Sequence, residues 1–496
     1  MLIKKNIYKA LLIILFAFVS SVEAANRYWV AVNDGTDKLW HDNANWSSSS
    51  GGSPGFNPPT KNQEAIFNGN STVDVKLGSA VTVKKLRIYN GYSGTIDLNG
   101  KYLGSKKGPA LYDGTVLVSA GSFFQSWGSG MYLYNGSTLT AAGDGKIKLG
   151  HNLHIMSGAT LNAPSGDNTR FIIKGGFNLH SGGTFNHNNG TVTMATKWKG
   201  TTGAAIRVDD GPGTGRNFYN LYKSGPRNVT LTTNNIEVLN DITVIGKGKI
   251  RAQSNNITIG GDWDLQKSTN LVAGTGTVIF NGSSAQTIDS PANFKNVQIS
   301  NSDVSLFRAA TVTGTLTIDS GATLDINENN LTAGTLANNG NLQLKGSETV
   351  SITTKDTDSG TITYDGTATG LAYGNAYYNL ALNTSGTMTL NAALDVNGSL
   401  TITGGTLNAA NNDINVAGNW TNNDSFISGT GKVTFDGTSN IITGGTGDSN
   451  DFYDVTLSGT SGSQSSVIAI DNDFEITSSG TWYTNCFAMT VSGDTT

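Results

Sequence analysis

The sequence predicts an all-β protein, a right-handed parallel β-helix (β-solenoid) with an aromatic-rich N-terminal cap. Three observations predict it: four similar aromatic boxes recur along the chain, short apolar pairs alternate with turn residues, and the chain has 63 glycines but only 14% charged residues. The boxes follow one another at nearly regular intervals, which indicates a repeat protein. Their first aromatics are Phe218, Phe294, Tyr377 and Phe452.

Other phrases keep the same period, so the repeat is a composite of several strands. A Gly-Thr-Val triplet or a variant of it precedes each box, at Gly190, Gly276, Gly360 and Gly431. We expect the repeats, each about 75–85 residues long, to fill residues 111–496, with the last one incomplete. The box aromatics, one per repeat, are predicted to be core residues.

Short strands separated by Gly, Asn, Asp, Thr and Ser turns fit two architectures, a parallel solenoid and a row of tandem antiparallel β-sandwiches. The solenoid is favoured because no proline follows Pro291 and no linker separates the repeats. Recurring pairs such as Asn255–Asn256, Asn329–Asn330 and Asn411–Asn412 predict polar corners between stacked turns. We call one turn of the solenoid a coil.

Composition limits the partners, the secondary structure and the cross-links of the chain. A net charge of −4 gives no basic surface for nucleic acid and no patch for acidic lipids. High glycine disfavours long helices, since each helical glycine costs about 1 kcal/mol relative to alanine. Cys486 is the only cysteine, so the chain has no intrachain disulfide.

The first residues predict export. Lys4, Lys5 and Lys9 precede the apolar run 10–19, and small residues end at Ala24. This is the pattern of a secretory signal peptide over residues 1–24, and its apolar run is shorter than the roughly 20 residues that a membrane span needs. We expect a mature chain without a membrane span, located outside a bacterium or on its surface.

Residues 25–110 are predicted to form the cap and the first coils. Tryptophans and prolines crowd this segment, and a cap would cover the exposed strand edges at this end of a solenoid. Nothing comparable occurs before Thr496. We therefore expect a further domain or another subunit to cover the C-terminal end.

The N-terminal segment also carries a resemblance. Its phrases Tyr28-Trp29-Val30, residues 39–47 (LWHDNANWS) and Ala65-Ile66-Phe67, together with repeats such as residues 274–282 (GTGTVIFNG), resemble bacterial β-helical surface and secreted repeat proteins. These include autotransporter passenger-like adhesins and large repeat proteins exported by Bacteroidetes-type bacteria. The resemblance implies a β-helical fold and an extracellular location, and it implies little about activity.

The strongest candidate for a reactive site is a glycine-rich excursion from the repeat. It carries Arg207, Asp209, Asp210 and Arg216, and pectate-lyase-like β-helix enzymes use Asp carboxylates for calcium and a basic residue on the sugar. One Asp pair supplies too few of the six to eight oxygens that calcium prefers. A solvated loop is the favoured interpretation. We expect no cofactor, with calcium bound at most adventitiously.

Two further residue sets have a structural and a functional interpretation. Trp40 and Trp46 could stack on sugar rings if exposed, or pack inside the cap if buried. His151 and His154 lie three apart on a predicted strand, so their side chains leave opposite faces and do not share a metal. We favour the structural interpretation of both sets and expect no metal site.

The sequence favours a secreted or cell-surface rod that is structural or adhesive and binds carbohydrate or other cell surfaces through an extended polar face. It is predicted not to be an enzyme. Two alternatives stay open: a polysaccharide-active β-helix lyase or hydrolase, and a carbohydrate-binding module carried on a rod.

Overall fold

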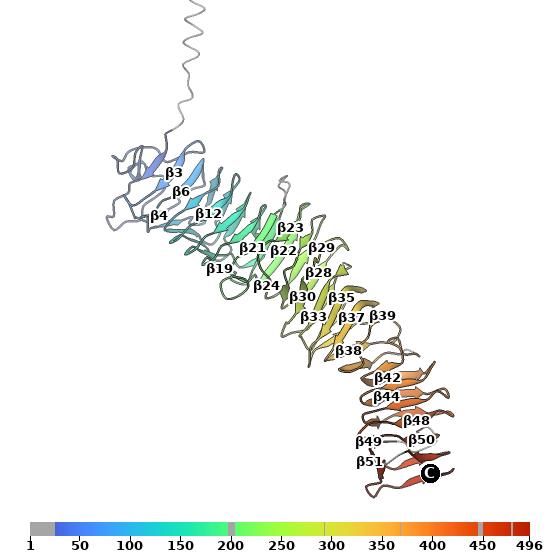
Figure 1. The fold of residues 1–496 in the computed structure, drawn as a ribbon. Coiled ribbons are helices and arrows are strands. Elements are labelled where there is room, and N and C mark those ends of the chain that lie inside the picture. Colours follow the sequence, from blue (N-terminus) through green and yellow to red (C-terminus); the bar gives the residue numbers. More distant parts are fainter. Residues whose placement is uncertain (1–24, 197–203, 292, 368, 445–449, 478–479) are drawn as a thin grey trace, which may run out of the picture. The chain divides into compact units, whose positions relative to one another are not determined.

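The computed structural model describes residues 25–196, 204–291, 293–367, 369–444, 450–477 and 480–496, and in them the chain is all-β (Figure 1). The helical content of these residues is one 3-10 turn, η1 (Asn43–Asn45). Strands stack in parallel as a β-solenoid of about 20 turns, which confirms the predicted fold class. The tandem-sandwich alternative is wrong, because strands pair in parallel with the strand one coil away. The pair β1 (Arg27–Trp29) and β2 (Trp46–Ser47), within the cap, is antiparallel.

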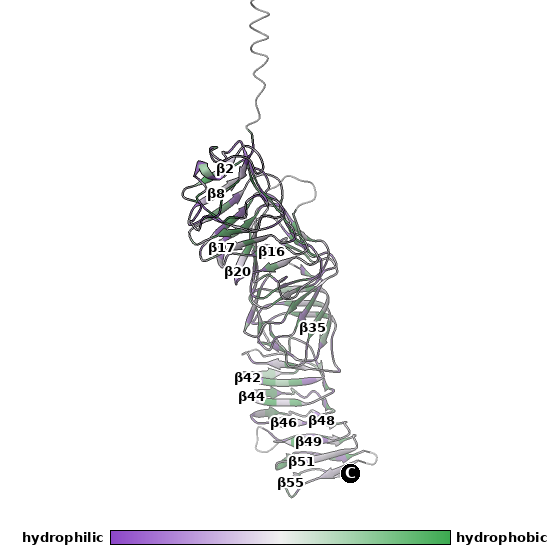
Figure 2. Cartoon of the chain, turned by 90° about the vertical axis from the view of Figure 1, so that its left-hand side faces the viewer, coloured by the Kyte–Doolittle hydropathy of each residue, from purple (hydrophilic) through white to green (hydrophobic). Residues whose placement is uncertain are grey.

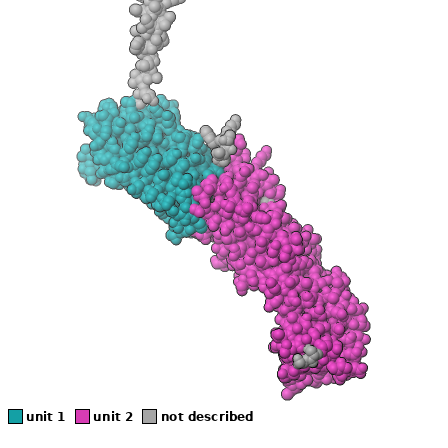
Figure 3. Space-filling view, viewed as in Figure 1, with its two compact units in different colours: residues 1–216 teal, residues 217–496 magenta. Residues whose placement is uncertain are grey.

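The chain divides into two compact units, Met1–Arg216 and Asn217–Thr496 (Figure 3). In the first unit each coil contributes a strand to each of three parallel sheets. The first sheet contains β3 (Glu64–Phe67), β6 (Lys85–Ile88), β9 (Ala110–Leu111), β12 (Met131–Leu133), β15 (Leu153–Ile155), β18 (Phe177–Leu179) and β21 (Ala204–Val208). The second contains β4 (Val75–Lys76), β7 (Thr95–Asp97), β10 (Thr115–Val118), β13 (Thr138–Ala141), β16 (Thr160–Asn162) and β19 (Thr184–Asn186). The third contains β5 (Val81–Val83), β8 (Tyr102–Ser105), β11 (Phe123–Ser126), β14 (Lys146–Leu149), β17 (Gly166–Ile173) and β20 (Gly190–Ala195).

The second unit is built in the same way around one long sheet. That sheet contains β22 (Asn220–Ser224), β25 (Ile242–Val244), β28 (Trp263–Leu265), β31 (Gln286–Asp289), β34 (Val304–Leu306), β36 (Thr323–Asp325), β38 (Asn341–Leu344), β40 (Thr361–Tyr364), β42 (Asn379–Thr389), β44 (Leu400–Asn408), β46 (Trp420–Asn422), β47 (Ser425–Ile427), β49 (Asn440–Thr443), β51 (Ser461–Gln464) and β54 (Thr481–Tyr483). Its neighbours are β24 (Ile236–Val238), β27 (Ile257–Ile259), β30 (Thr277–Phe280), β32 (Asn293–Phe294), β33 (Asn296–Ile299), β35 (Ala310–Ile318), β37 (Leu331–Asn338) and β39 (Val350–Thr354), followed by β41 (Ala376–Tyr377), β43 (Leu394–Val396), β45 (Ile414–Val416), β48 (Lys432–Phe435), β50 (Asp454–Leu457) and β53 (Phe474–Ile476). Shorter ladders are formed by β23 (Val229–Leu231), β26 (Ile250–Arg251) and β29 (Leu271–Val272), and by β52 (Ile468–Ile470) and β55 (Met489–Val491).

Alternation along each strand builds the core. In β10 the side chains of Val116 and Val118 are buried while those of Thr115 and Leu117 are half-exposed, and most strands repeat this pattern. Figure 2 shows the hydropathy of each residue, with hydrophobic segments on strands such as β42 and β44. Because pairing is in register, each buried side chain lies on the equivalent residue of the next coil. Val116, for example, pairs with Leu139, which pairs with Leu161. Within each unit the core is therefore a column of stacked apolar side chains, covered by Thr, Ser, Asn and Gly.

The aromatic boxes are core residues, as predicted: all four first aromatics are at most 1% exposed. Successive boxes nevertheless enter different sheets. The boxes of Phe218 and Tyr377 run into strands β22 and β42 of the long sheet, whereas those of Phe294 and Phe452 run into β33 and β50 of neighbouring sheets. The box spacing is thus not a whole number of coils, and only every second box returns to the same kind of position.

The N-terminal cap is a cluster of buried aromatic rings. Trp29, Trp40 and Trp46 are fully buried, and the ring centroid of each lies 5.6 Å from that of Phe67. The Trp46 indole N–H donates to the Trp40 carbonyl at 2.7 Å. These rings close the first coils of the solenoid.

Candidate binding surface

A turn with a glycine at the same place recurs in five successive coils of the first unit. The chain leaves the first sheet through a buried apolar residue, then a Tyr, Met or His, then Asn, Asp or Ser, then glycine. The glycines Gly91, Gly114, Gly136, Gly158 and Gly182 have φ of 91°, 63°, 88°, 72° and 73°, in the left-handed region that glycine adopts most readily. We call the resulting surface the corner surface. It consists of Tyr89, Tyr112, Tyr134, Met156 and His180, of Asn90, Asp113, Asn135, Ser157 and Ser181, and of Thr95, Thr115, Thr138, Thr160 and Thr184.

Parallel aromatic rings form the first part of this surface. The ring centroids of Tyr112 and Tyr134 are 4.3 Å apart with an interplanar angle of 1°, and Tyr89 lies parallel to Tyr112 at 5.9 Å. A second ladder runs from Tyr134 through Tyr132 to His154, which stacks on Tyr132 at 4.4 Å. Burial and then the neighbouring Tyr112 raise the pKa of Tyr134. The Tyr134 phenol therefore stays protonated at neutral pH and remains a hydrogen-bond donor.

A hollow of about 550 Å³ lies beside these rings. Its lining comprises Asn90, Tyr112, Asp113, Tyr134, Asn135, Gly136, Met156 and Ser157. Asp113 holds the turns on two coils, because its carboxylate accepts from the backbone N–H of Gly91 at 3.1 Å and of Gly114 at 2.9 Å. The hollow is thus built on fixed backbone, with amide, hydroxyl and phenol groups along its length.

A row of threonines, one per coil, lies along the same corner on the second sheet. Thr95, Thr115, Thr138, Thr160 and Thr184 pair successively in register. All five side chains are half-buried. Among the described residues, none of these hydroxyls has a hydrogen-bonding partner, so each is free to bind water or a ligand.

The charged candidates predicted on the glycine-rich excursion pair mainly with one another. Arg207 binds Asp209 through two hydrogen bonds, at 2.5 and 2.8 Å. Asp210 accepts from the Gly182 N–H at 3.0 Å and lies 3.8 Å from Arg216, and that backbone hydrogen bond is the main reason why its pKa is lowered. These pairs neutralise both carboxylates. In the described part of the chain, no group of three or more His, Cys, Asp or Glu side chains is placed to hold a metal ion.

Trp40 and Trp46 do not join these residues. Both lie in the cap, at the β2 end of the strand order in the first unit, whereas Arg207 lies in β21 at its other end. As ligand candidates the two tryptophans are corrected by the structure: both are 0% exposed, so neither presents a ring face to a sugar. Their hydrophobic area is used inside the cap.

Sequence reasoning did not find the corner surface or the histidine pair beside it. His154 Nδ1 lies 3.2 Å from His180 Nε2, and His180 Nδ1 lies 3.6 Å from the Asp209 carboxylate. Burial lowers the pKa of His154 to about 4, so this imidazole is neutral at pH 7. The available signal was the repeated Tyr-Asn/Asp-Gly triplet at residues 89–91, 112–114 and 134–136. The triplets form one surface because the coil length places them one above another.

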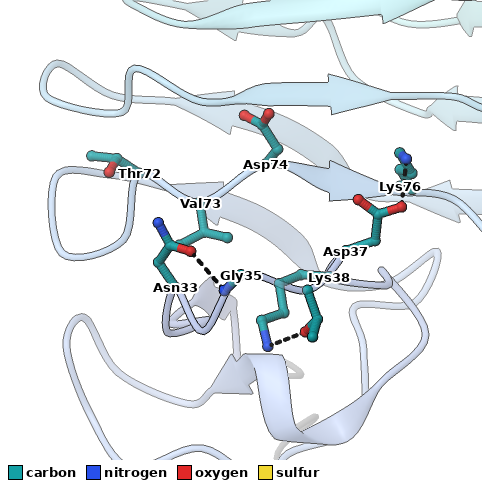
Figure 4. Close-up of a pocket in the computed structure, with 9 residues that line it drawn as sticks. Asn33, Gly35, Asp37, Lys38, Thr72, Val73, Asp74 and Lys76 are labelled. Carbon is teal, nitrogen blue, oxygen red and sulfur yellow. Dashed lines mark hydrogen bonds and ion pairs between the residues drawn. The ribbon is translucent and has the colours of Figure 1, made fainter.

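A second hollow, of about 510 Å³, lies in the cap region (Figure 4). Lys76 pairs with Asp37 at 2.5 Å, and Lys38 pairs with Asp34 at 2.5 Å. The bond from Lys38 is the largest cause of the lowered pKa of Asp34. The charges at this hollow are thus largely compensated, and it is confined to one end of the unit, whereas the corner surface extends over five coils.

No protein-family model, curated protein or solved structure matches the chain. Within the described residues, no helix has the length and apolar character needed to cross a membrane.

Proposed function

We propose that the chain is an exported β-solenoid with a structural or adhesive role at a bacterial surface, and that it binds other surfaces through an extended polar face. The observation that carries this proposal is the corner surface of the first unit. Its threonine hydroxyls repeat in register over five coils, and three of those coils add a tyrosine phenol, as expected for a surface that contacts an extended partner at many points.

The two alternatives from the sequence receive less support. The carboxylates of Asp209 and Asp210 are engaged by arginines and backbone, which argues against a lyase that would use them. A binding module that stacks sugars on Trp40 and Trp46 would require the cap to open. The signal peptide expected over residues 1–24 lies outside the described residues, and export is part of the proposal.

Binding of the labelled chain to intact bacterial and host cells tests this function. Asn135→Arg would place a long charged side chain at the exposed edge of the hollow, and we expect it to reduce cell binding at least tenfold. The matched control is Asn415→Arg, at an exposed position of β45 in the second unit, and should bind like the parent. Equal binding by all three proteins would contradict the proposal. Release of unsaturated products from uronate polymers with calcium would instead support an enzyme.

A further inference from the structure

The chemistry of the corner surface specifies its ligand more closely. We propose that it binds an extended, uncharged polysaccharide that lies along the stacking direction of the coils in the first unit, with one sugar residue facing each coil. This inference rests on the proposed function and names the class of partner for the same site.

The first argument is periodicity. Neighbouring strands in a sheet are about 4.8 Å apart, so the threonine of the corner surface recurs at about that distance in all five coils, and a tyrosine recurs in the first three. Tyr112 and Tyr134 follow this spacing, with ring centroids 4.3 Å apart. One sugar residue adds a similar length to an extended β-linked polysaccharide. Successive sugars would therefore each meet a threonine, and those that face the first three coils would also meet a tyrosine.

The second argument is hydrogen-bonding capacity. A sugar hydroxyl both donates and accepts, and so do a threonine hydroxyl, a phenol and a primary amide taken as a whole. The unpartnered hydroxyls of Thr115 and Thr138 lie on the coils that carry Tyr112 and Tyr134. Groups held on a rigid coil lose little conformational freedom on binding, which favours affinity from many modest contacts.

The third argument is charge. The residues that line the hollow include one carboxylate, that of Asp113, and no lysine or arginine. A polymer of uronic acids would bring its own carboxylates close to Asp113 without a cation among the lining residues to compensate them. An uncharged polysaccharide meets no such repulsion. The surface therefore favours neutral over acidic glycans.

The test uses the full chain and soluble polymers in affinity electrophoresis and calorimetry. The neutral set is β-glucan, xylan and mannan, and the acidic comparison is polygalacturonate. One variant, Tyr112→Phe with Tyr134→Phe, removes two phenol hydroxyls and keeps the stacked rings. A second, Thr115→Val with Thr138→Val, removes two free hydroxyls. The matched control is Thr401→Val with Thr421→Val, a half-buried in-register pair on β44 and β46 of the second unit.

We expect at least one neutral polysaccharide to bind, polygalacturonate to bind more weakly, and each corner variant to lower affinity by about tenfold, since two hydrogen bonds of about 0.5–1.5 kcal/mol each are lost. The control should bind like the parent, and circular dichroism should show all variants folded. Cell binding without binding to any neutral polysaccharide, or polysaccharide binding that both corner variants retain, would overturn this inference and leave the proposed function standing. Failure to bind cells and polymers alike would overturn both.

Discussion

At the scale of single residues, burial decides between two interpretations that the sequence leaves open. The sequence favours a cap for Trp40 and Trp46 and leaves a sugar platform open, because both need aromatic rings close together in sequence. The deciding fact is the position of Phe67 and the first coils, which cover them. That fact depends on contacts between distant segments, and no local pattern encodes it.

The cap cluster yields a stability prediction. Trp46→Ala removes a fully buried indole that contacts Trp29, Trp40 and Phe67, and we expect it to lower the free energy of unfolding of the cap by about 3–5 kcal/mol. Val32→Ala, at a valine that is 75% exposed, should cost less than about 1 kcal/mol. Urea unfolding followed by limited proteolysis measures both. Similar losses for the two variants would contradict the assignment of Trp46 to the core.

A buried lysine in the second unit predicts a pH dependence. Burial lowers the pKa of Lys223 from 10.5 to about 8, and its ammonium donates to the carbonyls of Ser224 and Gly225. Between pH 8 and 10.5 the unfolded chain keeps a proton that the folded chain has lost, so the stability contribution of this residue rises with pH across that window. We expect a gain of roughly 2–3 kcal/mol by pH 10.5 relative to Lys223→Met, measured by urea unfolding. Parallel pH profiles for the two proteins would refute the assignment.

At the scale of strands and turns, much of the fold follows from the sequence. Asn255, Asn329 and Asn412 lie at turns of the second unit, where the sequence predicts polar corners. Each donates its side-chain amide to a carbonyl of the preceding coil, that of Leu231, Leu306 or Leu390 respectively. The partner is therefore backbone rather than another asparagine. The spacing of these asparagines in the sequence predicts where the turns lie, whereas the carbonyl that each amide binds depends on the register between coils.

The register between coils also explains why the spacing of the aromatic boxes does not mark equivalent positions. Their regular spacing suggests one equivalent position per repeat. Ile242 pairs with Trp263, however, and Leu400 pairs with Trp420, so one coil is several times shorter than the interval between boxes. Successive boxes then fall at different points around the coil. The corner surface was not predicted for the same reason, because its Tyr-Asn/Asp-Gly triplets can be recognised as one surface only when that register is known.

One recurring turn offers an element-scale prediction. Consecutive residues with positive φ occur at Asn188–Asn189, Asn327–Glu328 and Ala410–Asn411, the last at 49° and 66°. Asparagine tolerates this region better than alanine. Ala410→Asn should therefore raise stability by about 0.5–1 kcal/mol, and Ala410→Val should lower it by a similar amount or more. Thermal unfolding of both variants tests the turn. The same stability for Val and Asn would show that the backbone there is not left-handed.

At the scale of the whole molecule, composition places stability in packing and backbone pairing. The single cysteine, Cys486, is exposed and unpaired. A bound ion stabilises a fold only through its own binding free energy, and we expect calcium to bind this chain at most adventitiously. Removing divalent metals with EDTA should therefore leave the thermal unfolding temperature within about 1 °C of its value in calcium. A clear drop after EDTA treatment, reversed by calcium, would reveal a specific calcium site.

The proposed export gives the last prediction for the whole chain. Expression in a bacterium with an intact secretory pathway should release a mature protein that begins at Ala25 or Asn26, since small residues at the end of the apolar run mark the cleavage site. Replacing Leu12 and Ile14 by arginine interrupts the apolar run and should keep the chain uncleaved in the cytoplasm. Val32→Arg, at a residue that is 75% exposed beyond that run, is the matched control and should be exported normally. N-terminal sequencing and cell fractionation measure both outcomes, and export of the double arginine variant with Met1 retained would refute the signal peptide.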